Sequence, residues 1–298
     1  MTGRGGRIGV IGAAGQLGEA VTRAFAGGDV VMTVRRDPRH GQLLLDLGEP
    51  ASIRAALDEA KPGVLVLAAA MCHVDGCEQD PATCGTVNVE GTRAVAGWAA
   101  RHDARVVFFS TDHVFDGTAP ISGEDDAVNP LNAYARSKVA GERILRELLP
   151  ERHVILRTAW LYGPDRARRN FALRLVDRLR AGERVPVPSD QWGAPTYTAY
   201  LAAATRFVVE RDIAGTFHAT GPELVDRVSL AQRIAARFGV DARGIVPTAT
   251  ADLRQPARRP LRVALRCDRL AALGAPAFRR IDAGLEELHA WVTGDGRQ

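Results

Sequence analysis

The chain has 298 residues, 46% of them hydrophobic and 25% charged, which suits one large α/β domain with a smaller lobe and excludes a disordered chain. Its net charge of +4 comes from arginines spread along the sequence and nearly balanced by Asp and Glu, which argues against a nucleic-acid partner. No apolar run suits a secretory signal or a membrane span, so we expect a cytoplasmic protein without a membrane partner. The four cysteines do not follow the spacing of a zinc site and are expected to be reduced thiols.

Apolar β-branched runs alternate with helical patterns up to about Trp160, as in a parallel sheet flanked by helices. The short connections predict right-handed crossovers and a Rossmann-type, doubly wound parallel sheet. The expected strands are Arg7–Ile11, Asp29–Val34, Gly63–Ala68, Arg105–Ser110, Val154–Thr158 and Thr216–Ala219. The expected helices are Leu17–Phe25, Ile53–Ala60, Asn88–Arg101, Tyr134–Leu148, Tyr197–Val209 and Ser229–Phe238.

The regular alternation ends after about Trp160, and the chain then returns to the sheet once. This pattern predicts a Rossmann domain followed by a smaller C-terminal substrate-binding lobe. We assign residues 1–160 and 196–221 to the Rossmann domain, and residues 161–195 and 222–298 to the lobe.

A glycine-rich turn follows the first expected strand and opens the first expected helix. Gly12 allows a tight turn, Gly15 allows the backbone to approach a pyrophosphate, and Gly18 allows close contact between helix and strand. The place of this turn at the first strand–helix junction predicts a dinucleotide site. Gln16 and Leu17, at the helix start, are assigned to the same site.

The end of the second expected strand indicates which dinucleotide binds. An acidic residue there would hold the adenosine ribose hydroxyls, but this chain has Arg35 and Arg36, whose guanidiniums suit a 2′-phosphate. Asp37 lies one position late and precedes a proline, so it is a poor substitute. NADP(H) is therefore favoured, with NAD(H) left open.

The reactive group is predicted from Tyr134 and Lys138, which are four residues apart and share one face of a helix. Only two of the chain's basic residues are lysines, so the lysine at position 138 indicates a requirement for a compact ammonium that a guanidinium would not meet. Ser110 and Thr111 end the fourth expected strand, at the edge where a Rossmann sheet binds its ligand. We expect Lys138 to hold the nicotinamide ribose and lower the phenol pKa, Tyr134 to exchange a proton with the substrate oxygen, and Thr111 to hydrogen-bond that oxygen.

Together these features resemble those of the extended short-chain dehydrogenases/reductases and, more narrowly, of the dTDP-4-dehydrorhamnose reductase family. The resemblance implies NAD(P)H-dependent reduction of the 4-keto group of a nucleotide-linked 4-dehydro-6-deoxyhexose, with a homodimer left open. Besides the glycine-rich turn and the Tyr134/Lys138 pair, it rests on Ser110–Asp112, Val114–Gly117, Pro130–Asn132, Ala68–Ala70, Val74–Asp75, Arg157–Gly163, Asp190–Thr196, Gly215–His218 and Pro256–Pro260.

By this resemblance, further residues are assigned to the cofactor and the substrate. Asp46 and Leu47 would face the adenine, and the cofactor would also contact Ser110, Ala68, Ala69 and Ala70. Val74, Trp160, Gln191 and Arg259 would line the sugar-nucleotide pocket. The chain departs from the family near the sugar, with His113 in place of a tyrosine and Met71-Cys72-His73 in place of a segment with a threonine. His113 is assigned to the substrate site, and no metal is expected, because the acidic intersubunit site of some relatives has no match.

Two alternatives stay open. A sugar-nucleotide epimerase or dehydratase has the same fold, but a dehydratase of this kind places an Asp-Glu pair after the threonine, where this chain has Asp112 and His113. The second alternative is a non-catalytic regulatory subunit resembling that of methionine adenosyltransferase, which also keeps a tyrosine–lysine pair.

Overall fold

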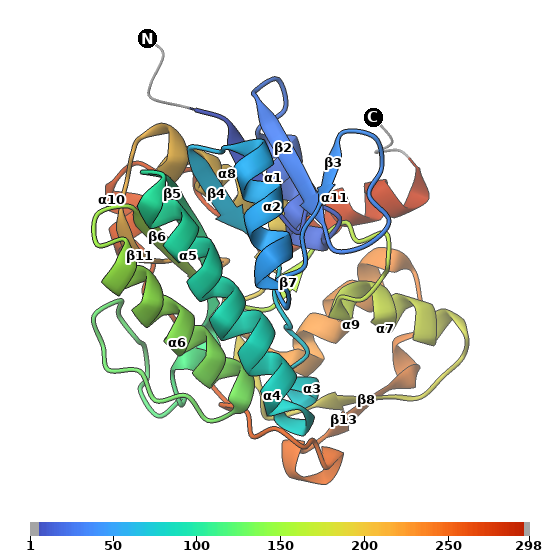
Figure 1. Cartoon of the computed structure of the whole chain (residues 1–298). Coiled ribbons are helices and arrows are strands. Elements are labelled where there is room, and N and C mark those ends of the chain that lie inside the picture. The colour runs from blue at the N-terminus through green and yellow to red at the C-terminus, as the bar shows by residue number, and fades with distance from the viewer. Residues whose placement is uncertain (1–5, 295–298) are drawn as a thin grey trace.

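A seven-stranded parallel sheet forms the centre of the molecule (Figure 1). The structure is a computed structural model that describes residues 6–294, so residues 1–5 and 295–298 of the two predicted units lie outside it. The strand order is β11-β6-β5-β4-β1-β2-β3, and the direction of winding reverses between β1 and β4, as in a Rossmann sheet. The strands are β1 (Ile8–Ile11), β2 (Val30–Val34), β3 (Gln42–Leu44), β4 (Val64–Leu67), β5 (Arg105–Thr111), β6 (His153–Thr158) and β11 (Gly215–His218).

Helices cover both faces of this sheet, because alternate residues of each buried strand point to opposite sides. On one face, Val107 and Phe109 of β5 pack with α1 and α8. On the other face, Val106 and Phe108 of the same strand pack with α2, α5 and α6, which lie side by side in Figure 1. These helices are α1 (Gln16–Ala24), α2 (Pro50–Ala60), α5 (Gly91–Arg101), α6 (Ala133–Leu148) and α8 (Thr198–Glu210).

A second core lies beyond the carboxyl edge of the sheet, between α7 (Phe171–Arg180), α9 (Arg227–Phe238) and α11 (Ile281–Thr293). The parallel pair of β8 (Val185–Pro188) and β13 (Ile245–Thr248) belongs to it. The remaining elements are short: α3 (Val74–Gln79), α4 (Pro81–Cys84), α10 (Asp268–Ala272), the π-helical turn η1 (Gly85–Glu90), β7 (Leu161–Tyr162), β9 (Trp192–Gly193), β10 (Thr196–Tyr197), β12 (Val225–Asp226), and the 3₁₀ turns η2 (Asp112–Val114), η3 (Ala242–Gly244) and η4 (Thr250–Leu253).

The predicted α/β fold with a parallel Rossmann-type sheet is confirmed, and every predicted strand lies within one residue of an observed one. The strand β3 was not predicted, because it has only three residues, and the short leucine run that contains it is not bounded by a recognisable strand pattern. The helix predicted over Asn88–Arg101 is α-helical only from Gly91, since η1 widens the turn before it. No helix in the described part of the chain is long and apolar enough to cross a membrane.

Candidate active site

The glycine-rich turn lies where the winding of the sheet reverses, beside the ends of β1 and β4. Gly12 has a φ of +87°, and a Cβ at this position would lie 2.7 Å from the Cβ of Ala69. A Cβ on Gly18 would lie 2.1 Å from the carbonyl oxygen of Gly12. Only glycine fits at either position, so the turn packs directly against the end of β4. Gly15 has no side chain to cap α1, and the first amides of this helix are therefore suited to an anion.

Two buried polar atoms along this edge lack a hydrogen-bond partner among residues 6–294. They are Nε2 of Gln16, in the first turn of α1, and Oγ1 of Thr158, which ends β6 in register with Thr111 of β5. Buried polar atoms are nearly always paired in a working protein. Together with the glycine turn, these unpaired atoms fit a long polar ligand such as a dinucleotide along the carboxyl edge of the sheet.

The residues predicted to bind the adenosine half of the cofactor differ in exposure. Arg35 and Arg36 directly follow β2 and are exposed, so both guanidiniums are accessible to a phosphate. The Asp46 carboxylate accepts a hydrogen bond of 2.9 Å from the amide of Gly48 and shapes the local turn. The Leu47 side chain is buried in the core against Gly91 of α5, so only its backbone could face an adenine.

Thr111, Tyr134 and Lys138 converge at the same edge, as predicted. The Asn132 side chain caps α6 by accepting a hydrogen bond of 2.8 Å from the amide of Ala135, and this fixes where the helix begins. Tyr134 lies in the first turn and is hydrogen-bonded with Thr111 at the end of β5. Lys138 follows one turn later and is only 4% exposed, with Nζ 3.9 Å from the centroid of the Phe108 ring.

The titration of these groups differs in part from the prediction. Burial raises the pKa of Tyr134 well above its usual value, as do Cys72 and Asp112, and the hydrogen bond with Thr111 opposes this only in part. The expected lowering of the phenol pKa is therefore wrong for this structure, because burial raises the pKa more than the hydrogen bond with Thr111 lowers it. Burial lowers the pKa of Lys138 to about 8. At neutral pH Tyr134 is a protonated phenol, the form that donates a proton.

A buried ion pair that the sequence analysis missed holds α6 against the sheet. The Glu142 carboxylate lies one turn after Lys138 and accepts hydrogen bonds of 2.9 and 2.8 Å from the guanidinium of Arg157 on β6. It also accepts a hydrogen bond of 2.6 Å from the Ser110 hydroxyl on β5. Because these bonds join α6 to two strands, they fix the helix face that carries Tyr134 and Lys138. The only sequence signal was the four-residue spacing from Lys138 to Glu142.

A second missed residue, Asn88, joins the helix before α5 to the same face of α6. It lies in the π-helical turn η1, a type of distortion that occurs often at functional sites. Its Nδ2 donates to the hydroxyl of Ser137 at 3.0 Å and to the carbonyl of Met71 at 2.9 Å, and its Oδ1 accepts from the Met71 amide at 2.8 Å. Asn88 thus ties the loop after β4 to the catalytic helix.

Of the predicted substrate residues, Arg259 and Val74 lie on segments that meet. The Arg259 guanidinium donates a hydrogen bond of 2.8 Å to Asp75, the neighbour of Val74 at the start of α3. Although burial raises it, hydrogen bonds from Arg259 and from the amide of Ala257 bring the pKa of Asp75 below its usual value. This contact joins the C-terminal segment to the loop after β4.

His113 lies next to Tyr134. Its ring meets the Tyr134 ring edge-on, with 6.4 Å between centroids. Its Nδ1 is buried and has no hydrogen-bond partner in the described part of the chain. Burial lowers the pKa of His113, so the imidazole is neutral at physiological pH. The unpaired nitrogen fits the predicted contact with a substrate.

Trp160 and Gln191 meet through Arg227, which the sequence analysis did not single out. The Gln191 carbonyl accepts a hydrogen bond of 2.9 Å from the Arg227 amide, and the Arg227 guanidinium stacks on the Trp160 ring. Gln191 itself is buried, and its Nε2 donates to the Thr250 hydroxyl at 3.1 Å. Trp160 and Gln191, both predicted to contact the substrate, are thus joined on the side of the second core.

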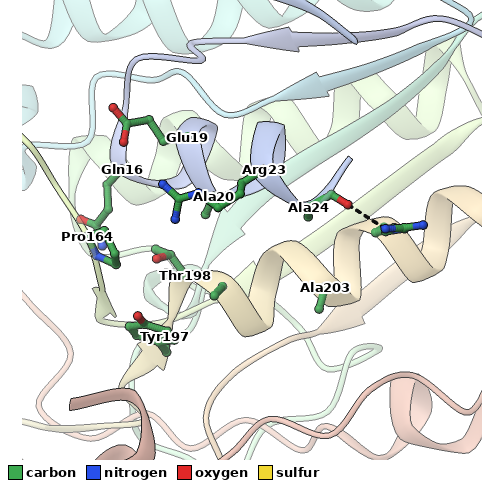
Figure 2. Close-up of a pocket in the computed structure, with 11 residues that line it drawn as sticks. Gln16, Glu19, Ala20, Arg23, Ala24, Pro164, Tyr197, Thr198 and Ala203 are labelled. Atoms are coloured by element: carbon green, nitrogen blue, oxygen red, sulfur yellow. Dashed lines mark hydrogen bonds between the residues drawn. The ribbon is translucent and has the colours of Figure 1, made fainter. Parts of the chain in front are cut away.

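A separate hollow of about 350 Å³ lies between α1 and α8 (Figure 2). Its floor consists of small side chains from the two helices, including Ala20 and Ala203, and Arg23 stands at its side. Thr111, Tyr134 and Lys138 do not line it. Gln16 does line it, so the hollow adjoins the glycine-rich turn but not these three side chains.

Comparison with known proteins places this geometry in one family. Residues 6–292 match the model of the RmlD substrate binding domain. The chain is 34% identical to a dTDP-4-keto-6-deoxy-D-glucose reductase from Streptomyces niveus, over 95% of this chain and 93% of the relative. A crystal structure of a dTDP-4-dehydrorhamnose reductase from Clostridium acetobutylicum has a TM-score of 0.88 and 31% identity, covering 96% of this chain and 99% of that one. A dTDP-4-dehydrorhamnose reductase from Bacillus anthracis, solved in complex with NADP, has a TM-score of 0.87 and 27% identity, with coverage of 95% and 98%.

Proposed function

The chain belongs to the RmlD substrate binding domain family, and we propose that it is an oxidoreductase that reduces the 4-keto group of a nucleotide-linked 4-dehydro-6-deoxyhexose with NADPH. The substrate we propose is dTDP-4-dehydro-L-rhamnose or a close relative, as the names of its relatives suggest. The observation that carries this proposal is the meeting of Thr111, Tyr134 and Lys138 at the sheet edge that also holds the glycine turn.

In this proposal the side chains have distinct tasks. The nicotinamide, when bound, supplies the hydride to the keto carbon. Tyr134 donates its phenolic proton to the keto oxygen, and the raised pKa keeps that proton in place at neutral pH. Thr111 hydrogen-bonds the same oxygen and supports the negative charge that develops on it. Lys138, one helical turn after Tyr134, binds the ribose hydroxyls of the cofactor through its ammonium group.

We propose NADP(H) rather than NAD(H) because of the residues after β2. Arg35 and Arg36 are exposed there, and no acidic side chain takes the place that would bind the ribose hydroxyls. The NADP in the Bacillus anthracis structure is consistent with this choice.

The two-part domain division and the homodimer are not tested by these observations and stay predictions from the sequence.

The proposal is tested by incubating the purified chain with NADPH and a panel of nucleotide-linked 4-keto-6-deoxy sugars, with absorbance at 340 nm as the readout. We expect NADPH to be consumed with at least one dTDP-linked 4-keto sugar and a 4-hydroxy sugar to form in equal amount. A dehydratase or epimerase would convert its nucleotide sugar without net NADPH consumption. Either that result or inertness toward the whole panel would contradict the proposed reduction.

A further inference from the structure

Arg227 occupies an unusual place at the start of α9. Its guanidinium lies 3.4 Å from the centroid of the Trp160 ring and 4.8 Å from that of Phe171. A small cavity of about 100 Å³ adjoins these three side chains. Trp160 follows β6, at the same edge of the sheet where Thr111 ends β5. The stacked pair therefore lies near the carboxyl edge of the sheet, where the proposed substrate would bind.

The position of the Trp160 ring is fixed by its surroundings. Trp160 has a φ of +43°, a left-handed conformation that is rare for a bulky side chain and persists only where the structure enforces it. On one side, a Cβ at Gly193 would lie 2.4 Å from the ring, so only glycine leaves room for it. The Arg227 guanidinium also stacks on the ring. The carbonyl of Trp160 accepts a hydrogen bond of 3.3 Å from the amide of Thr196.

The N–H groups of the Arg227 guanidinium lack hydrogen-bond partners in the described part of the chain. Within residues 6–294, none of its five N–H groups takes part in a hydrogen bond or an ion pair. The charges of Asp112, Arg259 and Arg174 act on the guanidinium only at longer range. Arg227 is half-buried, and burial lowers its pKa to about 9. The ring faces of Trp160 and Phe171 offer no hydrogen-bond acceptor, so these N–H groups are free to donate to a bound ligand.

We propose that Arg227 is a specificity-determining residue that donates hydrogen bonds to an oxygen of the hexose in the bound nucleotide sugar. This inference rests on the proposed function and assigns a new group to its substrate site. The hexose is the part of the substrate that reaches this position, because Asp112 directly follows β5 and Trp160 lies two residues after the end of β6. Thr111, which contacts the reacting oxygen in the proposed reaction, ends that same β5. The diphosphate is attached to the sugar carbon remote from the one reduced, and so lies farther from these strand ends.

The test compares the affinities of Arg227→Gln and wild type for two probes, dTDP-L-rhamnose and dTDP, by titration calorimetry in the presence of NADP. We expect the dissociation constant for dTDP-L-rhamnose to rise about 10- to 100-fold, as when a charge-assisted hydrogen bond is lost, with that for dTDP unchanged. Arg237→Gln, an exposed arginine on the same helix, is the matched control and should bind both probes like wild type. Near-ultraviolet circular dichroism verifies that each variant is folded. Arg227→Lys is a second variant that retains the charge, and we expect it also to lose affinity for dTDP-L-rhamnose but not for dTDP.

A selective loss smaller than about 10-fold in Arg227→Gln would overturn the assignment. An equal loss for dTDP would also overturn it, because Arg227 would then bind the diphosphate or act only on the shape of the site. Failure of the wild type to bind dTDP-L-rhamnose would contradict the proposed function itself. The two failures are distinguishable, since only the second appears in the unaltered protein.

Discussion

Replacing Glu142 with glutamine should strongly destabilise the protein, because it removes the negative charge of a buried ion pair. The side chains of Glu142 and Arg157 are 1% and 2% exposed, and two hydrogen bonds join them. Breaking such a pair from one side leaves a buried guanidinium uncompensated, which costs about 3–5 kcal/mol. For a chain of this size, about 2–4 °C of melting temperature is lost per kcal/mol, so we expect a fall on the order of 6–20 °C.

The assay is equilibrium unfolding in urea, followed by tryptophan fluorescence, for wild type and Glu142→Gln at pH 7. Asp241→Asn is the control, because its ion pair with Arg243 is exposed and should contribute little. A loss of less than about 1 kcal/mol in Glu142→Gln would refute the reasoning, since an ordinary surface substitution costs no more than that.

The same pair predicts a pH dependence of stability. Although burial raises it, hydrogen bonds from Arg157 and Ser110 hold the pKa of Glu142 below its usual value. A lowered folded-state pKa contributes stability that is present above the ordinary glutamate pKa and is lost as the pH falls through the folded value. Wild type should therefore lose more stability on acidification than Glu142→Gln. Equal acid sensitivity of the two proteins would contradict this link.

Two further predictions concern the cofactor and the catalytic cation. NADPH should be preferred over NADH, and Arg35→Ala/Arg36→Ala should reduce that preference, because each charge-assisted contact with a phosphate contributes about 1.5–3 kcal/mol. Equal kcat/KM for both cofactors in wild type would contradict the assignment of NADP(H). Lys138→Arg should be severely impaired in kcat while Lys61→Arg is unchanged, since a planar guanidinium does not replace a compact ammonium. The wild-type rate should also fall as the pH rises through about 8, where Lys138 loses its charge, whereas a flat profile would count against that role.

Local sequence patterns were sufficient to predict the sheet and to place Thr111, Tyr134 and Lys138 at one of its edges. The strands of the Rossmann sheet are apolar on both faces, so Val106, Val107 and their equivalents form continuous apolar runs that mark each strand. Because the strands are parallel, residues at their carboxyl ends, such as Thr111 of β5, lie at one edge of the sheet. The i, i+4 spacing of Tyr134 and Lys138 fixes their shared helix face without any tertiary information.

The remaining features depend on contacts between distant segments. Arg227 is one arginine among many, and its role emerges only where the start of α9 meets the residue after β6. The left-handed backbone of Trp160 has no local signal, and the residues that pack on its ring, Gly193 and Arg227, lie far along the chain. The titration of Tyr134 was mispredicted for a similar reason: the sequence indicates its neighbours on the helix but not the burial that raises its pKa.

The central claim, that Tyr134 donates the proton in a ketone reduction, is tested most directly by the rate of NADPH oxidation in Tyr134→Phe with the best substrate of the panel. Phenylalanine keeps the ring and removes only the hydroxyl, so NADPH should bind as in wild type. We predict that kcat falls by about 10²–10⁴-fold, the usual contribution of a positioned general acid. A variant that binds NADPH normally and keeps more than about half of the wild-type kcat, well outside that range, would contradict the account.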